Sequence, residues 1–318
     1  MYLNPYSNTH FFSFFGILLQ RLLAFCSGQL PFAELASDEV QILVLIGVAL
    51  SSALVGSFLV LRKMTMLANA LSHTILLGIV VVYLLFHELF HLRAFFIASL
   101  VTGILTTFLT EFLTKVIRLQ EDASIGLVFT SLFATGILLI NLFFPNTHIG
   151  IELVMGNVDA LQKNDLLLVY TTLGMNVLAF TLFFKEFKLT TFDRALSSSL
   201  GLSPTLYNYF LMVLTSATAI SAFRSVGVFM VLAFFVVPVL IARLFTHTLS
   251  TLIYLSMGIG GLSALVGVAL SRHIFTIFQV GLSTGGIVVC TLLLFYLIAI
   301  PFALKRRVAT SALYRAVK

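Results

Sequence analysis

Long apolar runs with few interruptions fill almost the whole chain from residue 41 to residue 303. Each run is about 20 residues long, which is the length an α-helix needs to cross roughly 30 Å of hydrocarbon. Backbone polar groups must be satisfied internally in a bilayer, so helices are the expected form. The pattern predicts nine spans, at residues 41–61, 65–86, 94–115, 124–144, 165–184, 207–223, 226–245, 251–271 and 277–303.

A shorter apolar run at residues 11–26 is interrupted by Gln20 and Arg21. Such a segment favours an amphipathic helix lying at the membrane interface over a true span. The predicted fold is therefore an all-α, polytopic integral membrane helical bundle with about nine transmembrane helices. We expect an N-terminal segment with an interfacial helix (1–40), a single transmembrane domain (41–304) and a basic cytoplasmic tail (305–318).

Composition agrees with a chain embedded in membrane lipid. Hydrophobic residues make up 60% of the 318 residues and charged residues only 9%, against about 25% charged in soluble domains. The net charge of +6 comes from basic residues that mostly flank the apolar runs. No basic patch alternates with aromatics, which disfavours nucleic-acid binding. Lys and Arg gather after the first, third, fifth, seventh and ninth spans, so those ends are predicted to be cytoplasmic.

Two polar residues in the second predicted span, Asn69 and His73, are four positions apart and share one helix face. An ionisable residue inside a span indicates a functional site. An amide oxygen and an imidazole together suit a divalent first-row metal ion. The alternative is that both side chains make hydrogen bonds between helices.

The longest predicted cytoplasmic segment lies between the fifth and sixth spans. Asp193 is placed to cap a short helix, Gly201 to end it, and Pro204 lies just beyond. Leu196 and Leu200 would share one face of that helix. A short capped helix facing the cytoplasm suggests docking to a partner, while a helical linker without contacts is the alternative.

Signatures of catalysis are missing from the sequence. It contains no G-x-x-x-x-G-K-[ST] phosphate-binding loop, no H-E-x-x-H and no G-x-S-x-G. We therefore expect no enzymatic activity in this chain itself.

Several short motifs, in this order and spacing, resemble the permease subunits of bacterial ATP-binding-cassette (ABC) importers for zinc, manganese or iron. They are 56–62 (GSFLVLR), 70–73 (ALSH) with Gly78, 121–126 (EDASIG), 156–157 (GN), 192–201 (FDRALSSSLG), 226–228 (VGV), and 237–238 (VP) with 242–243 (AR). The resemblance covers residues 40 to 275.

The resemblance implies a multi-pass protein of the bacterial cell (inner) membrane that moves Mn, Fe or Zn ions into the cytoplasm. It implies three partners: an ABC ATPase subunit, an extracytoplasmic metal-binding protein, and a second or homologous permease copy completing a dimer. ATP would act on the ATPase subunit, and no cofactor would be bound permanently. Asn69 and His73 would line the metal path.

The same resemblance assigns ATPase coupling to Phe192, Asp193, Ser197 and Gly201. It also shows one departure, because many family members have Asp where this chain has Asn69. Asparagine keeps an oxygen ligand but removes a negative charge, which weakens the attraction for a cation.

Two other transport functions remain as alternatives. A permease for metal chelates such as a siderophore or cobalamin would need a wide path with few ligands, so His73 argues against it. An ion-driven secondary transporter would need acidic residues at mid-membrane, and the acids of this chain lie near the ends of the spans.

Overall fold

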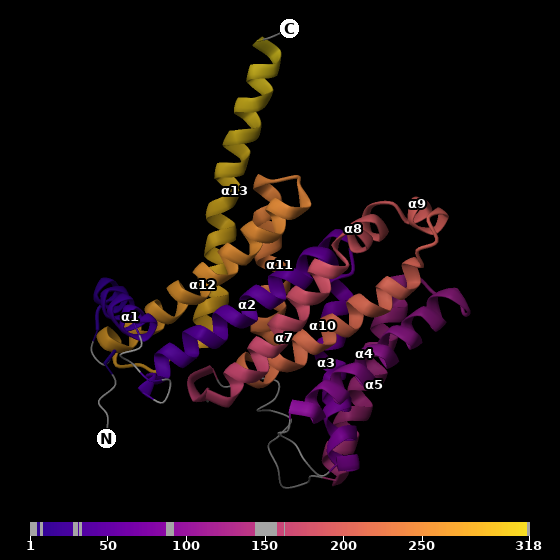
Figure 1. Cartoon of the computed structure of the whole chain (residues 1–318), viewed down its shortest axis with the longest axis horizontal. Coiled ribbons are helices and arrows are strands. Elements are labelled where there is room, and N and C mark those ends of the chain that lie inside the picture. Colours follow the sequence, from indigo (N-terminus) through magenta and orange to yellow (C-terminus); the bar gives the residue numbers. More distant parts are fainter. Residues whose placement is uncertain are drawn as a thin grey trace.

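The computed structural model describes residues 5–6, 9–27, 31, 34–86, 92–143, 158–161 and 163–316. This part of the chain is helical and contains no strand (Figure 1). The elements are α1 (Phe11–Cys26), α2 (Ser37–Leu61), α3 (Thr65–Phe86), α4 (Leu92–Lys115), α5 (Glu121–Phe143), the 3₁₀ turn η2 (Val158–Ala160), α7 (Lys163–Leu182), α8 (Phe184–Phe192), α9 (Arg194–Ser199), α10 (Pro204–Val226), α11 (Val228–Phe245), α12 (Leu249–Phe278) and α13 (Thr284–Ala316). The 156–157 motif lies outside the described residues.

The long helices confirm the predicted bundle. Within the described residues, nine helices have 18 residues or more, and each corresponds to one predicted span, with shifted ends. By length and hydropathy, seven of the described helices can cross a membrane. The other two, α3 and α4, have 22 and 24 residues, and some of their side chains lie outside the description.

Helix α2 forms the centre of the bundle. It packs against α7, α10, α11 and α12, and nearly all of its residues are buried. Close approach depends on small residues. A Cβ added to Gly56 would lie 2.1 Å from the carbonyl oxygen of Phe235 in α11, and one added to Gly260 of α12 would lie 3.3 Å from the Cβ of Ala49. Small residues are the usual contact points between membrane helices, because lipid supplies little hydrophobic driving force.

Buried polar side chains join the central helices. The Asn176 amide of α7 donates to Ser51 of α2 at 2.6 Å and to Thr218 of α10 at 2.7 Å. The Ser57 and Ser256 hydroxyls join α2 to α12 at 3.3 Å. Such bonds are worth about 0.6 kcal/mol each in a membrane, so they fix the register of the helices more than they stabilise the bundle.

A second group, α3, α4 and α5, packs beside this centre, and α10 contacts both groups. Figure 1 shows the three helices together on the side of the bundle away from α1 and α13. A Cβ on Gly78 of α3 would lie 1.9 Å from the Thr102 hydroxyl of α4. This second group includes α3, the helix on which the candidate metal ligands lie.

Helix α1 is 16 residues long, so it is about 24 Å in length, shorter than a hydrocarbon core. Its first amide, Phe11, donates to His273 near the end of α12 at 3.2 Å. Arg21 pairs with Glu39 in the first turn of α2. Both anchors lie at one end of the bundle, since α2 begins there and α12 ends there. This supports α1 as an interfacial helix, which remains a prediction.

The boundary between the last two spans lies later than predicted. Helix α12 continues to Phe278, and α13 begins only at Thr284. The extra turns persist because Arg272, which looks like a span end in the sequence, is paired with Asp38 of α2. The helix stops instead at Gln279, whose φ is 52°. Similarly, α10 and α11 meet at Gly227, with φ 81°, rather than at residues 223–225.

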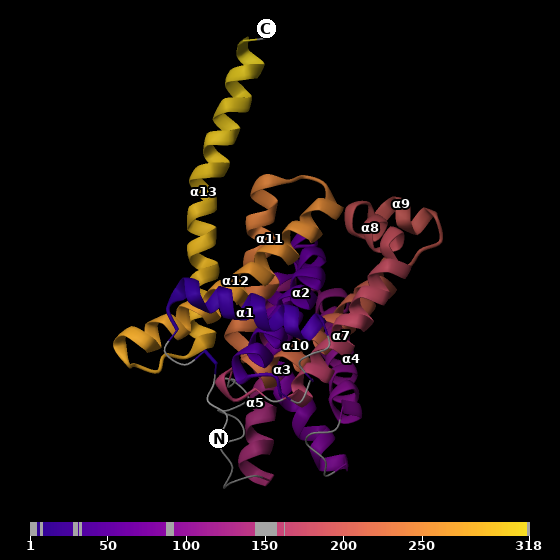
Figure 2. The ribbon, with the colours of Figure 1, turned by 60° about the vertical axis from the view of Figure 1, so that its left-hand side comes forward.

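The predicted tail at 305–318 is, as far as Ala316, a continuation of α13. Figures 1 and 2 both show this helix extending beyond the rest of the bundle, at the end where α8 and α9 lie. The prediction placed both segments in the cytoplasm, so their common position is consistent with it.

Candidate functional site

The candidate metal ligands lie near the start of α3, just after a tight turn from α2. Lys63 occupies the left-handed region with φ 61°. The Met64 amide donates back to the Leu59 carbonyl at 2.9 Å, and the Lys63 amide to that of Val60 at 3.2 Å. This pattern closes α2 as a Schellman motif. It fixes where α3 begins, and hence the depth of His73, which lies about 12 Å along the helix from Thr65.

His73 packs against two aromatic rings of α5. The imidazole centroid lies 5.0 Å from the ring of Phe129 and 5.3 Å from that of Phe133. Its Nδ1 is buried and has no hydrogen-bond partner among the described residues. A histidine that only joins two helices would use this nitrogen for a bond. The Nδ1 of His73 is therefore available as a metal ligand, next to the rings of Phe129 and Phe133.

Asn69 lies one turn before His73 on the same face and is half-buried. No hydrogen bond joins its amide to another described residue. An interhelical hydrogen bond of Asn69, which was the alternative to metal binding, is thus not formed within the described part of the chain. In that same part, no three His, Cys, Asp or Glu side chains converge on a metal-sized site.

The predicted short cytoplasmic helix is α9, and a second helix that the sequence did not predict, α8, precedes it, with Asp193 between the two. The Asp193 carboxylate accepts the Leu196 amide at 2.9 Å, which confirms its capping position. Gly201, with φ 80°, follows the end of α9. Its amide donates to the Ser198 carbonyl at 3.1 Å, and the Leu202 amide donates to that of Ser197 at 3.0 Å. The stop of α9 is therefore another Schellman motif, which needs a residue tolerant of positive φ.

The four predicted coupling residues differ in accessibility. Phe192 is 61% exposed and Asp193 is exposed, whereas Ser197 is fully buried and donates to the Arg194 carbonyl at 2.8 Å. Leu196 and Leu200 are 47% and 64% exposed. A partner could touch Phe192 and the two leucines, while Ser197 and Gly201 would act through the shape of the segment.

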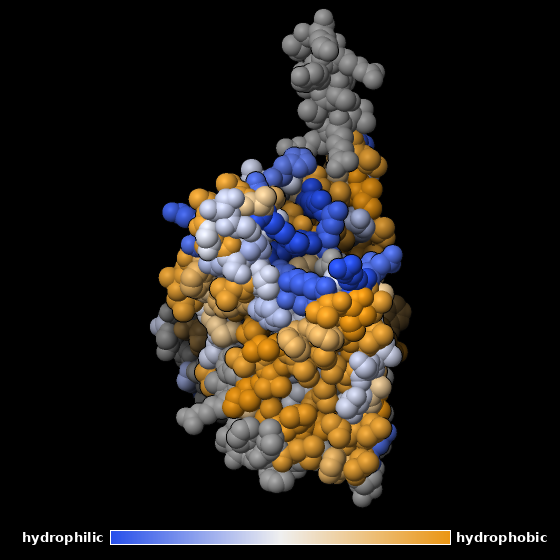
Figure 3. Space-filling model, turned by 90° about the vertical axis from the view of Figure 1, so that its right-hand side faces the viewer, coloured by the Kyte–Doolittle hydropathy of each residue, from blue (hydrophilic) through white to orange (hydrophobic). Residues whose placement is uncertain are grey.

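Figure 3 views the side of the molecule on which α9 lies. Hydrophilic side chains gather towards the upper end of this face, above a broad hydrophobic surface. Exposed basic residues near the predicted cytoplasmic ends of the helices include Lys63, Lys115, Lys185 and Lys188. The division matches a membrane-embedded belt below a cytoplasmic face.

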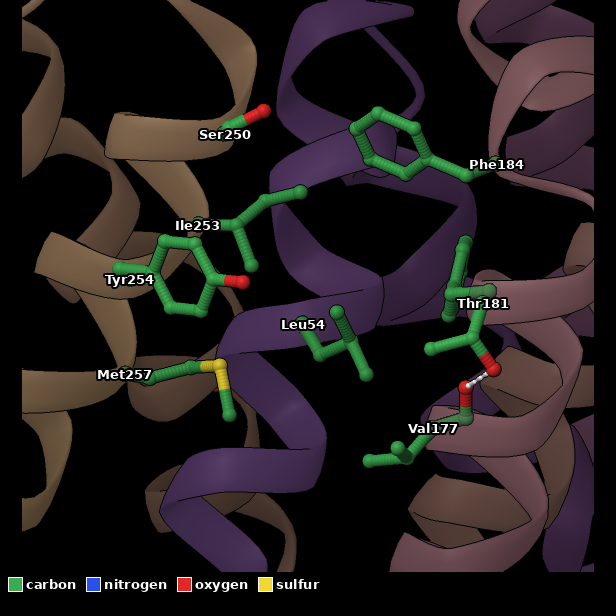
Figure 4. A pocket seen from close by; sticks show the side chains of 9 residues that line it. Leu54, Val177, Thr181, Phe184, Ser250, Ile253, Tyr254 and Met257 are labelled. Atoms are coloured by element: carbon green, nitrogen blue, oxygen red, sulfur yellow. Dashed lines mark hydrogen bonds between the residues drawn. The ribbon is translucent and has the colours of Figure 1, made fainter.

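A separate apolar pocket of about 410 Å³ opens between α2, α7 and α12. Figure 4 shows its walls, with Leu54 of α2 at the back and α7 and α12 on either side. The Thr181 hydroxyl in this pocket donates to the Val177 carbonyl of its own helix at 2.8 Å. The other lining residues are Phe180, Phe184, Ser250, Ile253, Tyr254 and Met257. The pocket lacks an imidazole or carboxylate, so its chemistry does not suit a metal ion.

A multi-span helical bundle with short capped helices at one end defines a polytopic membrane protein, and comparison with known proteins gives its family. The chain belongs to the ABC 3 transport family, which matches residues 39–303. This confirms the family suggested by the sequence motifs.

Individual relatives agree. A probable metal transport system membrane protein of Chlamydia trachomatis is 41% identical over 307 residues, covering 96% of each chain. The manganese transport system membrane protein MntD of Bacillus subtilis is 36% identical over 237 residues, covering 70% of this chain and 79% of MntD. The structure of PsaBC from Streptococcus pneumoniae in complex with Fab superposes with a TM-score of 0.72 and 26% identity, covering 87% of this chain and 95% of that chain.

Sequence reasoning missed the surroundings of the two sites. Phe129 and Phe133 beside His73 were read only as span residues. Arg62 entered the sequence analysis only as a charge after the first span and as the end of the 56–62 motif, yet it bonds to Thr190, Thr191 and Asn208. No local signal marks these contacts, because the partners lie more than 50 residues apart in the sequence.

Proposed function

We propose that the chain is the membrane-spanning permease subunit of an ABC importer that carries a divalent first-row metal ion (Mn²⁺, Fe²⁺ or Zn²⁺) into the cytoplasm. Its family membership and its relatives named for metal and manganese transport support this proposal. The observation that carries it is the buried Nδ1 of His73 in a membrane helix, which has no hydrogen-bond partner among the described residues and lies one turn from Asn69. Of the three ions, manganese is the one named in a relative reported above.

The proposed assembly includes partners that supply energy and cargo. An ABC ATPase subunit would dock on α8 and α9, where Phe192, Leu196 and Leu200 are exposed. An extracytoplasmic metal-binding protein would deliver the ion to the opposite end, and a second permease copy would complete the complex. The chain would reside in the bacterial inner membrane. The metal ion is cargo in this scheme, and no resident cofactor is proposed.

Asn69 and His73 would hold the ion in passage. A neutral imidazole and an amide oxygen bind a divalent ion without a fixed negative charge, so they release it more readily than carboxylates would. Transport requires such release. The rings of Phe129 and Phe133 would keep water and lipid away from the His73 imidazole.

The test is uptake of radioactive Mn²⁺ into proteoliposomes that contain the permease with its ATPase and binding protein. His73→Ala should lower ATP-dependent uptake by about tenfold or more, the loss expected from removing one ligand interaction of ~1.4 kcal/mol. His247→Ala is the matched control, because His247 is exposed after α11. Equal uptake by His73→Ala and the wild type would refute the metal path. Competition by Fe²⁺ and Zn²⁺ in the same assay ranks the three ions.

A further inference from the structure

Arg62 lies where three parts of the molecule meet. It is the residue after the last turn of α2 and lies three positions before α3, which carries Asn69 and His73. Its guanidinium carbon lies 5.9 Å from the ring centroid of Phe187 in α8. The side chain thus spans from the turn below the candidate metal path to the candidate ATPase-docking segment.

Each kind of guanidinium nitrogen has its own acceptor. Nε donates to the Thr191 hydroxyl at 2.9 Å, Nη2 to the Thr190 hydroxyl at 2.8 Å, and Nη1 to the side-chain oxygen Oδ1 of Asn208 at 2.7 Å. Thr190 and Thr191 are in the last turn of α8, and Asn208 is in the first turns of α10. Only a planar fork of five donors can satisfy acceptors on two helices in this way. The bonds tie α8 and α10 to the end of α2.

All three acceptors are neutral, and no carboxylate contacts Arg62 among the described residues. Burial, and to a smaller extent the charge of Arg194, lowers the pKa of Arg62 to about 10, so the group is still a cation at neutral pH. Burying a cation without a counter-ion opposes folding. The three charge-assisted hydrogen bonds offset this cost, and their geometry fixes α8 and α10 relative to the end of α2.

Helix α8 has a second contact with α2, beside the hydrogen bonds of Arg62. Thr190 and Thr191 each donate to carbonyls one turn earlier in α8, to Glu186 at 2.8 Å and to Phe187 at 2.6 Å. Their hydroxyls are therefore held in fixed positions on α8, and Phe187 is fully buried against Phe58 of α2 at 5.6 Å. A displacement of α8 would move the Thr190 and Thr191 acceptors together relative to Asn208 on α10, and so would pull on the Arg62 guanidinium.

We propose that Arg62 is a positioning residue that transmits movement of the α8–α9 segment to the α2–α3 turn, and so to the base of the metal path. This inference rests on the proposed function, because it assumes that an ATPase moves α8 and α9. The guanidinium acts through its three hydrogen bonds and does not touch the transported ion.

The test measures Mn²⁺ uptake and ATP hydrolysis in the same proteoliposomes, using the complete complex. For Arg62→Gln we expect the ratio of ions moved to ATP hydrolysed to fall by about tenfold, within the range of ordinary coupling free energies. Co-purification with the ATPase and the rate of hydrolysis should stay near wild type. Arg62→Lys, whose single ammonium cannot reach both helices, should restore the ratio only in part. Lys305→Gln, which removes an exposed charge on α13 away from the α2–α3 turn, is the matched control.

A second variant tests the link from its other end. The double substitution Thr190→Val and Thr191→Val keeps the shape of both side chains but removes two acceptors, and it should lower the same ratio. If uptake and hydrolysis instead fall together, in step with the thermal midpoint, Arg62 has only a structural role and the inference is wrong. An unchanged ratio in both variants would also overturn it. Failure of the wild-type chain to bind an ATPase would reject the proposed function itself, and this inference with it.

Discussion

The carboxamide of Asn69 sets the charge of the candidate metal path. Asn69→Asp would add one negative charge next to the ion while keeping the size of the side chain. At about 4 Å, two unit charges attract by roughly 1 kcal/mol even in bulk water, and more strongly where water is scarce. We expect the concentration of Mn²⁺ that gives half-maximal uptake to fall by about tenfold, which corresponds to ~1.4 kcal/mol. The maximal rate should fall as well, because the ion is released more slowly.

The double variant Asn69→Asp, His73→Ala shows whether the two residues act at one site. If they do, the gain from the new carboxylate should be smaller in the absence of the imidazole, which is a non-additive result. Strict additivity of the two effects would mean that Asn69 and His73 do not share an ion.

Gly201 is the second residue whose chemistry can be tested alone. Its φ of 80° costs an L-residue about 1–2 kcal/mol, although open space surrounds the position of an added Cβ. Gly201→Ala should therefore loosen the end of α9 through backbone strain and not through a clash. Affinity for the ATPase, measured by titration in detergent, should fall severalfold. Gly126→Ala in α5 also meets open space but has no positive φ, so it should bind like the wild type.

Residues whose roles depend on local chemistry could be predicted from the sequence. The Asp193 cap and the Gly201 stop follow from the bonding needs of helix ends, which act within a few positions. Arg62 could not be predicted in the same way. Its acceptors Thr190, Thr191 and Asn208 lie 128, 129 and 146 positions away, and no short-range pattern brings them together.

At the scale of elements, the close contact between α2 and α11 can be tested through Gly56. Gly56→Ala would place a Cβ 2.1 Å from the backbone carbonyl of Phe235, which cannot turn aside as a side chain could. We expect the free energy of unfolding to fall by roughly 1–3 kcal/mol, as for other overpacked interiors. The measurement is the thermal midpoint in detergent, which should be lower. Gly258→Ala in α12 meets nothing within 4 Å and should leave the midpoint unchanged or raise it. Equal midpoints for the two variants would show that the helices can separate without cost.

The spans themselves were predictable because the bilayer sets their length and composition in one dimension. The ends of the spans were less predictable where a tertiary contact determines the last residue of the helix. Arg272 remains inside α12 because Asp38 is present on α2 to pair with it, and the sequence does not show that partner. The extent of α12 therefore depends on packing, whereas the start of α3 depends on the local turn at Lys63.

The whole molecule has two different ends joined by an apolar belt. At one end lie α8, α9 and the projecting part of α13 (Figures 1 and 2). At the other end, α1 is tied to α2 and α12 by Arg21 and His273. Because the helices alternate in direction, a single assignment of one end to the cytoplasm fixes every connection. The excess of Lys and Arg predicts that the α8–α9 end faces the cytoplasm.

This orientation can be tested by labelling single cysteines in intact cells. With Cys26 and Cys290 both replaced by Ala, a cysteine is introduced by Ser283→Cys, in the exposed link between α12 and α13, or by Ser198→Cys, on exposed α9. A membrane-impermeant maleimide should modify the first variant in intact cells and the second only after permeabilisation. The reverse pattern would invert the molecule and remove α9 from the reach of a cytoplasmic ATPase. Labelling of both variants in intact cells would contradict the alternation of the spans. The helices α10, α11 and α12 separate the two cysteines, and three crossings would place them on opposite sides of the membrane.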